Sequence, residues 1–139
     1  MTKPSPSGYS GKPLSRKLGI KEDQQVVLVN PPDGFLRQLR NMPHGVQFVG
    51  KPNAMVDIVH VFVTQREALS TQLVELRAIL KPDACIWVSW PKKASKVPST
   101  VTEDTIRELA LPLGLVDVKV CAVDEVWSAL KLVIRKELR

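Results

Sequence analysis

The segment of this sequence with the clearest capacity for chemistry is a tryptophan followed by lysines. Trp90 is followed closely by three lysines, Lys92, Lys93 and Lys96. The next acidic residue is Glu103, so nearby residues do not neutralise this positive charge. Such a segment can bind a phosphate-bearing or otherwise anionic ligand, or nucleic acid by stacking and charge. The alternative is a solvated loop whose tryptophan closes the end of the core, and we give the two equal weight.

A second group with possible chemistry is a pair of acids near the C-terminus. Asp124 and Glu125 stand between two expected strands, and Trp127 follows them. In an enzyme acting on an anionic substrate, one of these acids would be the general base, and Lys92 or Lys93 would stabilise charge. A hairpin turn is the simpler interpretation of the two acids, and we favour it.

Other reactive residues form no recognisable catalytic or metal-binding set. His60 lies within an apolar run, which predicts a buried, hydrogen-bonded histidine, and His44 lies in a Pro-His-Gly turn that should be exposed. Cys85 and Cys121 stand far apart, without a C-x-x-C spacing or partner histidines, so we expect neither a disulfide nor a metal site. The chain contains no Gly-x-Gly, and we expect no cofactor.

The net charge of +6 is unevenly distributed along the chain. Residues 1–21 contain no acidic residue, and their basic residues are Lys3, Lys12, Arg16, Lys17 and Lys21. We therefore expect a basic N-terminal arm with a short helix over 1–21 and a single α/β domain over 22–139. No run reaches the roughly 18 apolar residues of a membrane span, and the start lacks a signal peptide's apolar core. We expect a cytoplasmic protein with no membrane partner.

The remaining sequence predicts strands alternating with helices. Continuous apolar runs predict strands at 26–29, 46–49, 56–63 and 85–90, followed by a hairpin of 116–123 and 128–136. The run at 56–63 does not alternate, which predicts a central strand covered on both faces. Helices are expected between these strands, and three patterns predict where they begin. These are an N-cap at Asp33 and capping boxes at Thr64–Glu67 and Thr100–Glu103.

This element order predicts a three-layer α/β fold with a mainly parallel, Rossmann-like sheet of about six strands and a C-terminal antiparallel hairpin. The Leu-Lys-Pro-Asp turn at 80–83, followed by a strand, a helix and a terminal hairpin, resembles the class I S-adenosylmethionine-dependent methyltransferase fold. The resemblance implies that the last strand inserts antiparallel beside strand 85–90. It also implies that one strand and one helix of the usual first half are missing.

Two loops of the expected sheet differ from the loops that bind the cofactor in methyltransferases. Such sites need glycines and free amides after the first strand, where this chain has Asn30-Pro31-Pro32-Asp33-Gly34. They also have an acid at the end of the second strand, where this chain has Gly50-Lys51-Pro52-Asn53. This chain would therefore lack both the glycine-rich loop and the acid that usually bind the cofactor.

Three motifs resemble those of a family of small bacterial proteins whose domain has no assigned function. The motifs are G-Y-S-x-x-P-L at 8–14, W-P-K-K-x-S at 90–95 and V-D-E-x-W-S at 123–128. The resemblance covers nearly the whole chain after residue 8. It implies a bacterial cytoplasmic protein and supplies no reaction, cofactor or catalytic residues.

Ligands of open α/β sheets bind at the carboxyl ends of the strands, so we predict a site at that edge. Our first hypothesis is a non-catalytic binding domain for a small anionic ligand or a protein partner. The candidate ligand-binding residues are Tyr9, Ser10, Arg66, Trp90, Lys92, Lys93, Asp124 and Trp127. The alternatives are the enzyme described above and a nucleic-acid-associated module that uses the basic arm and loop. Self-association through an edge strand is a further possibility.

Overall fold

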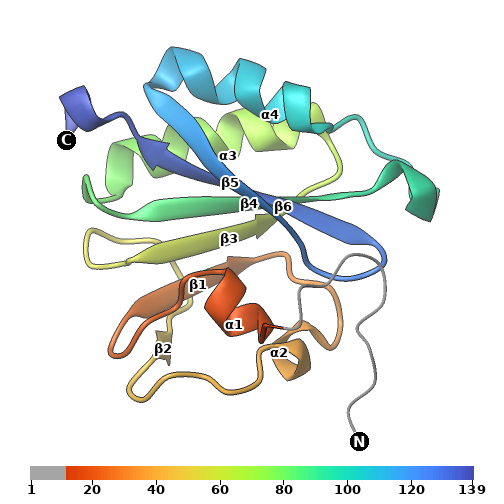
Figure 1. Cartoon of the computed structure of the whole chain (residues 1–139). Helices are drawn as coiled ribbons and strands as arrows, with labels where there is room; N and C mark the ends of the chain where they lie inside the picture. The colour runs from red at the N-terminus through yellow and green to blue at the C-terminus, as the bar shows by residue number, and fades with distance from the viewer. Residues whose placement is uncertain (1–11) are drawn as a thin grey trace, which may run out of the picture.

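A central sheet organises the computed structural model, which describes residues 12–139. Within these residues six strands form one sheet in the order β2-β1-β3-β4-β6-β5 (Figure 1). The strands are β1 (Gln25–Val29), β2 (Gln47–Phe48), β3 (Ile58–Phe62), β4 (Cys85–Pro91), β5 (Leu115–Ala122) and β6 (Trp127–Ile134). The first four run parallel, whereas β6 pairs antiparallel with both β4 and β5. The predicted fold class and the insertion of the last strand beside β4 are confirmed.

Helices cover both faces of the sheet, which makes three layers. They are α1 (Leu14–Lys17), α2 (Phe35–Gln38), α3 (Arg66–Ile79) and α4 (Glu103–Ala110), with 3-10 turns at Lys93–Ser95, Leu111–Leu113 and Lys136–Leu138. The apolar side chains of α3 and α4 pack on one face, and those around α1 and α2 pack on the other. All residues of β3 are buried, as the missing alternation of the run at 56–63 predicts. All residues of β4 are buried as well.

A histidine and a serine form a polar pair inside the core. His60 Nε2 and Ser89 Oγ are hydrogen-bonded at 2.6 Å, and both residues are buried. The His60 ring stacks on Phe62 with a centroid distance of 4.3 Å. Burial lowers the pKa of His60 to about 3. The buried, hydrogen-bonded histidine predicted from the sequence is confirmed, and His44 is exposed as expected.

The N-terminus of α3 is capped by a distant threonine. The predicted capping box at Thr64–Glu67 is wrong, because α3 begins at Arg66 and its N-cap, Gln65, has no side-chain cap bond. Instead the Arg66 N–H donates to Thr100 Oγ1 at 2.7 Å. The Thr64 carbonyl accepts the Thr100 N–H at 2.8 Å. The loop before α4 therefore docks on the start of α3.

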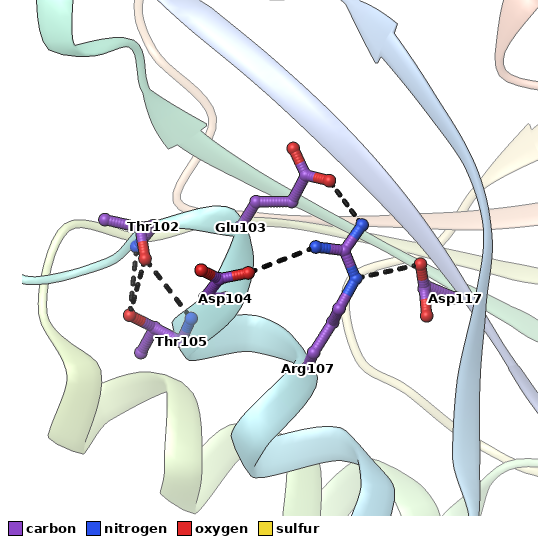
Figure 2. A network of polar contacts seen from close by, with 6 residues as sticks. All are labelled: Thr102, Glu103, Asp104, Thr105, Arg107 and Asp117. Atoms are coloured by element: carbon purple, nitrogen blue, oxygen red, sulfur yellow. Dashed lines mark hydrogen bonds and ion pairs between the residues drawn. The ribbon is translucent and has the colours of Figure 1, made fainter.

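This docking also moves the start of α4. The Thr100 hydroxyl is used by α3, so the predicted box at Thr100–Glu103 is displaced, and Thr102 and Thr105 form the capping box (Figure 2). Each donates its backbone N–H to the other's Oγ1 at 3.2 Å. The N-cap predicted at Asp33 is also wrong, because Gly34, with φ 80°, precedes α2 without a side-chain cap. Glycine adopts a left-handed φ readily, and it has no side chain that could accept a hydrogen bond from the first backbone amides of α2.

We expect acidification to destabilise the fold through His60. The folded pKa of about 3 lies below the value near 6.5 of an unfolded histidine, so stability is lost as the pH falls below 6.5. Between pH 7 and pH 5 the loss is about 2 kcal/mol, measured by urea denaturation. The His44→Gln variant should retain this loss and the His60→Gln variant should not. An equal loss in both variants would contradict the buried, neutral state of His60.

The cap on α3 can be tested with two threonine variants. Thr100→Val removes the acceptor of the Arg66 N–H and should lower the free energy of unfolding by about 1 kcal/mol. Thr64→Val removes only the hydroxyl of the unformed capping box, and its effect should stay below about 0.5 kcal/mol. Urea denaturation measures both, and a larger effect of Thr64→Val would favour the local capping box.

Candidate functional site

Two loops meet at the carboxyl edge of the sheet. The chain leaving β4 is joined to the turn between β5 and β6, because the Lys92 N–H donates to the Val126 carbonyl at 2.7 Å. This bond continues the β4–β6 ladder, whose last pair is Pro91 and Trp127. The segments that contain Trp90, Lys92, Asp124 and Trp127 are therefore neighbours, as the sequence predicts.

A cavity of about 690 Å³ lies between the loop after β4 and the start of α4. We call it the lysine cavity. Its lining includes Trp90, Lys92, Lys93, Lys96, Thr102 and Asp104. Three of the predicted ligand-binding residues thus share one hollow. Lys96 and Thr102 are absent from the predicted set, although Lys96 belongs to the same basic segment and could have been included on that basis.

The lysines are carried by a loop with a defined backbone. Lys93–Ser95 form a 3-10 turn, after which Lys96 adopts a left-handed conformation with φ 62°. Ser95 Oγ donates to the Lys92 carbonyl at 2.6 Å and accepts the Val97 N–H at 3.3 Å. These bonds stabilise the turn from which the lysine side chains project.

Trp90 forms the inner wall of the cavity and is itself a core residue. It is 8% exposed and packs with the apolar side chains of the α3 and α4 layer. Little of the ring is open for stacking against a base, so the nucleic-acid alternative loses the stacking that it needs. The interpretation of Trp90 as the residue that closes the end of the core is favoured.

The acids near the lysine cavity are paired with an arginine (Figure 2). Arg107 bonds Asp117 at 3.0 Å and Asp104 at 3.3 Å, and it also pairs with Glu103. Its hydrogen bonds to Asp117 and then to Glu103 raise the pKa of the guanidinium. Glu103 and Asp104 are therefore directed to Arg107, which also links α4 to β5.

These pairs leave the three lysines without a carboxylate partner in the described part of the chain. Between residues 12 and 139, no carboxylate oxygen lies within 4.0 Å of the Nζ of Lys92, Lys93 or Lys96. Lys93 and Lys96 are exposed, and Lys92 is half-buried. Glu103 and Asp104 belong to the same lining as the three lysines, so the cavity carries a formal charge of +1.

The remaining predicted residues lie elsewhere. Trp127 lies on the opposite face of the sheet, where its ring meets Phe62 edge-on at 5.3 Å. Arg66 pairs with Glu108 at 3.5 Å between α3 and α4. Tyr9 and Ser10 fall outside the described residues. The structure therefore brings together Trp90, Lys92 and Lys93, and not the full predicted set.

Asp124 shapes a turn. Its Oδ1 accepts the backbone N–H groups of Val126 and Trp127, each at 2.8 Å, and its Oδ2 accepts the Gln38 amide at 3.2 Å. Glu125 is exposed. The hairpin-turn interpretation of the two acids is supported, because the Asp124 carboxylate is engaged by three donors and does not line the lysine cavity.

Comparison with known proteins identifies a family and a fold. The sequence profile of a family described as "Protein of unknown function (DUF3052)" matches residues 16–136. No curated protein sequence matches the chain.

Across residues 12–139, no helix combines the length and the apolar composition needed to cross a lipid bilayer. In that same part of the chain, no three His, Cys, Asp or Glu side chains are grouped to hold a metal ion.

Solved structures show that the fold is that of methyltransferases. A SAM-dependent methyltransferase from Aquifex aeolicus has a TM-score of 0.63 at 17% identity, covering 86% of both chains. The fibrillarin pre-rRNA processing protein of Methanococcus jannaschii has a TM-score of 0.55 at 11% identity, covering 83% of this chain and 68% of its own. Aeropyrum pernix fibrillarin, with natively bound S-adenosyl-L-methionine, has a TM-score of 0.52 at 15% identity, covering 82% and 68%. At such identities the likeness concerns the fold alone.

The residues present do not fit S-adenosylmethionine in the way that glycine-rich loops bind such ligands. After β1, Pro31 and Pro32 have no N–H, and the Phe35 N–H is used by the Pro32 carbonyl at 3.1 Å. After β2, Lys51 follows Gly50 where a ribose-binding acid would be needed. We therefore derive no methyl-transfer step.

The structural role of Asp124 can be tested against its neighbour. Asp124→Ala removes an acceptor of three hydrogen bonds and should lower the free energy of unfolding by about 1–3 kcal/mol. Glu125→Ala, at the exposed adjacent position, should change it by less than about 0.5 kcal/mol. Urea denaturation compares the two, and a result in which Asp124→Ala is as stable as the parent would refute the turn role.

Proposed function

We propose that this chain, which belongs to the DUF3052 family of proteins of unknown function, binds a small anionic ligand in the lysine cavity without transforming it. The observation that carries the proposal is that Lys92, Lys93 and Lys96 line one cavity of about 690 Å³. This volume is within the range of roughly 300–1,000 Å³ of small-molecule sites. The cavity also lies at the carboxyl edge, where α/β sheets bind ligands.

Charge supports an anionic ligand. The lysines form no ion pair with the described residues, since the Arg107 guanidinium engages Glu103 and Asp104. A phosphate or carboxylate group entering the cavity would therefore find ammonium groups that are not already neutralised by an adjacent carboxylate. Trp90 adds an apolar wall to the same lining, and the Thr102 hydroxyl is engaged by Thr105 in the capping box of α4.

The order of the loop supports binding as well. The hydrogen bonds of Ser95 to Lys92 and Val97 keep the backbone of the turn in one shape. A ligand then needs to immobilise the lysine side chains and not the main chain, which lowers the entropic cost of association.

Binding without chemistry is favoured by the state of the nearby acids. Asp104 and Glu103 are held by Arg107, and Asp124 accepts three hydrogen bonds within its own turn and from α2. A general base must be within hydrogen-bond reach of its substrate. Of the two bases that the enzyme alternative names, Asp124 is thus engaged by other partners, and Glu125 is exposed and does not line the lysine cavity.

The test is a thermal-shift screen of the full chain at constant ionic strength, with inorganic phosphate, pyrophosphate, citrate and adenosine monophosphate as probes. The double variant Lys92→Gln/Lys93→Gln should raise the Kd of a stabilising anion by at least about tenfold, which corresponds to about 1.4 kcal/mol. The double variant Lys21→Gln/Lys51→Gln removes the same charge at exposed positions outside the cavity. It should leave the Kd within about twofold of the parent value.

Two results would overturn the proposal. One is that none of the four anions stabilises the parent protein. The other is that both double variants lose binding equally, which would indicate a response to net charge and not a site. Binding to a DNA or RNA oligomer that weakens steeply with salt and is unaffected by Lys92→Gln/Lys93→Gln would also favour another function.

A further inference from the structure

A second cavity lies on the opposite face of the sheet, and we infer that it binds a dianionic group of the phosphate monoester type. Its volume is about 390 Å³, and it lies among α1, the chain after α2 and the turn after β5. We call it the α1–α2 cavity. Its polar lining consists of Lys12, Lys17, Gln38, Arg40 and Asp124. This inference is independent of the lysine cavity, which shares none of these residues.

The positive charges of the α1–α2 cavity come from three parts of the chain. Lys12 precedes α1, Lys17 is the last residue of α1, and Arg40 follows α2. Lys119 of β5 also lies close, because its Nζ donates to the Lys17 carbonyl at 3.4 Å. Lys12 and Lys17 belong to the basic N-terminal segment, and the fold brings Arg40 and Lys119, which are distant in sequence, to the same place.

The depth of Lys17 strengthens its attraction for an anion. This residue is 8% exposed, whereas Lys12 and Arg40 are exposed at the rim. Charges interact more strongly where water is partly excluded than on the open surface. Arginine adds a planar set of donors that can bond two oxygens of one phosphate or carboxylate group. A buried ammonium and a guanidinium at the rim are suited to an anion that inserts into the cavity.

The charge balance indicates the class of anion. Lys12, Lys17 and Arg40 give +3 and Asp124 gives −1, so the lining carries a formal charge of +2. The Asp124 carboxylate is already engaged by two backbone amides and by the Gln38 side chain. A phosphate monoester, with a charge of about −1.5 to −2 at pH 7, matches this balance better than a single carboxylate. Leu14 and Val123 line the remaining wall and offer apolar contact to the organic part of the ester.

The experiment is a titration of the full chain with inorganic phosphate, followed by amide NMR at pH 7 and constant ionic strength. The backbone amides of Gln38, Val123 and Asp124 should shift with saturation. The Arg40→Gln variant should raise the Kd by at least about tenfold. The matched control is Arg37→Gln, which removes the same charge from an exposed position on α2 outside the cavity. It should leave the Kd within about twofold of the parent value.

A parallel titration with acetate tests the charge of the ligand, and its Kd should be at least about tenfold weaker than that of phosphate. The Lys12→Gln variant provides a second test at the rim and should also weaken phosphate binding. Equal affinity for acetate and phosphate would overturn the dianion assignment. Equal losses in Arg37→Gln and Arg40→Gln, or an absence of saturable shifts at the α1–α2 cavity, would overturn the site. Shifts confined to the amides of Lys92–Lys96 would overturn it while supporting the lysine cavity.

Discussion

The antiparallel insertion of β6 between β4 and β5 is the constraint on which the carboxyl edge depends. Seven residues of β4 pair with β6, from Cys85 with Val133 to Pro91 with Trp127, and the bond from Lys92 to Val126 extends this pairing into the loops. Adjacent strand residues point to opposite faces. Trp90 and Trp127 are therefore close along the edge yet belong to different layers. The lysine cavity lies on the side of the sheet to which Trp90 belongs, and the α1–α2 cavity lies on the other side.

The strands could be predicted from the sequence because each of them corresponds to a short apolar run, which is a local pattern. The uninterrupted apolar run around His60 indicated a strand with two covered faces, and burial of all of β3 agrees. The basic segment after Trp90 indicated a positive loop, and its lysines do line one cavity. The positions of Asp124 and Trp127 relative to those lysines could not be predicted, because they depend on the register of β6 against β4 and on which face each side chain takes.

Helix starts show the same division between local and long-range control. Thr64 and Thr100 both begin sequences with the spacing of a capping box, but neither forms the predicted box. Their hydroxyl and carbonyl groups instead join two segments of the fold. The ion pair between Glu103 and Arg107 follows from helical spacing, whereas the bond from Arg107 to Asp117 needs β5 to lie beside α4. Contacts within one helix can be inferred from spacing, and contacts between elements require the topology.

The contact between Arg66 and Thr100 couples the completion of one helix to the arrival of a much later segment. The two residues are 34 positions apart, so in a chain that has been synthesised only as far as α3 this exposed amide has water and not Thr100 as its acceptor. The first turn of α3 acquires its side-chain cap when the loop preceding α4 docks, so the start of one helix depends on the segment that precedes the other. Local opening of that loop would therefore also release the first turn of α3.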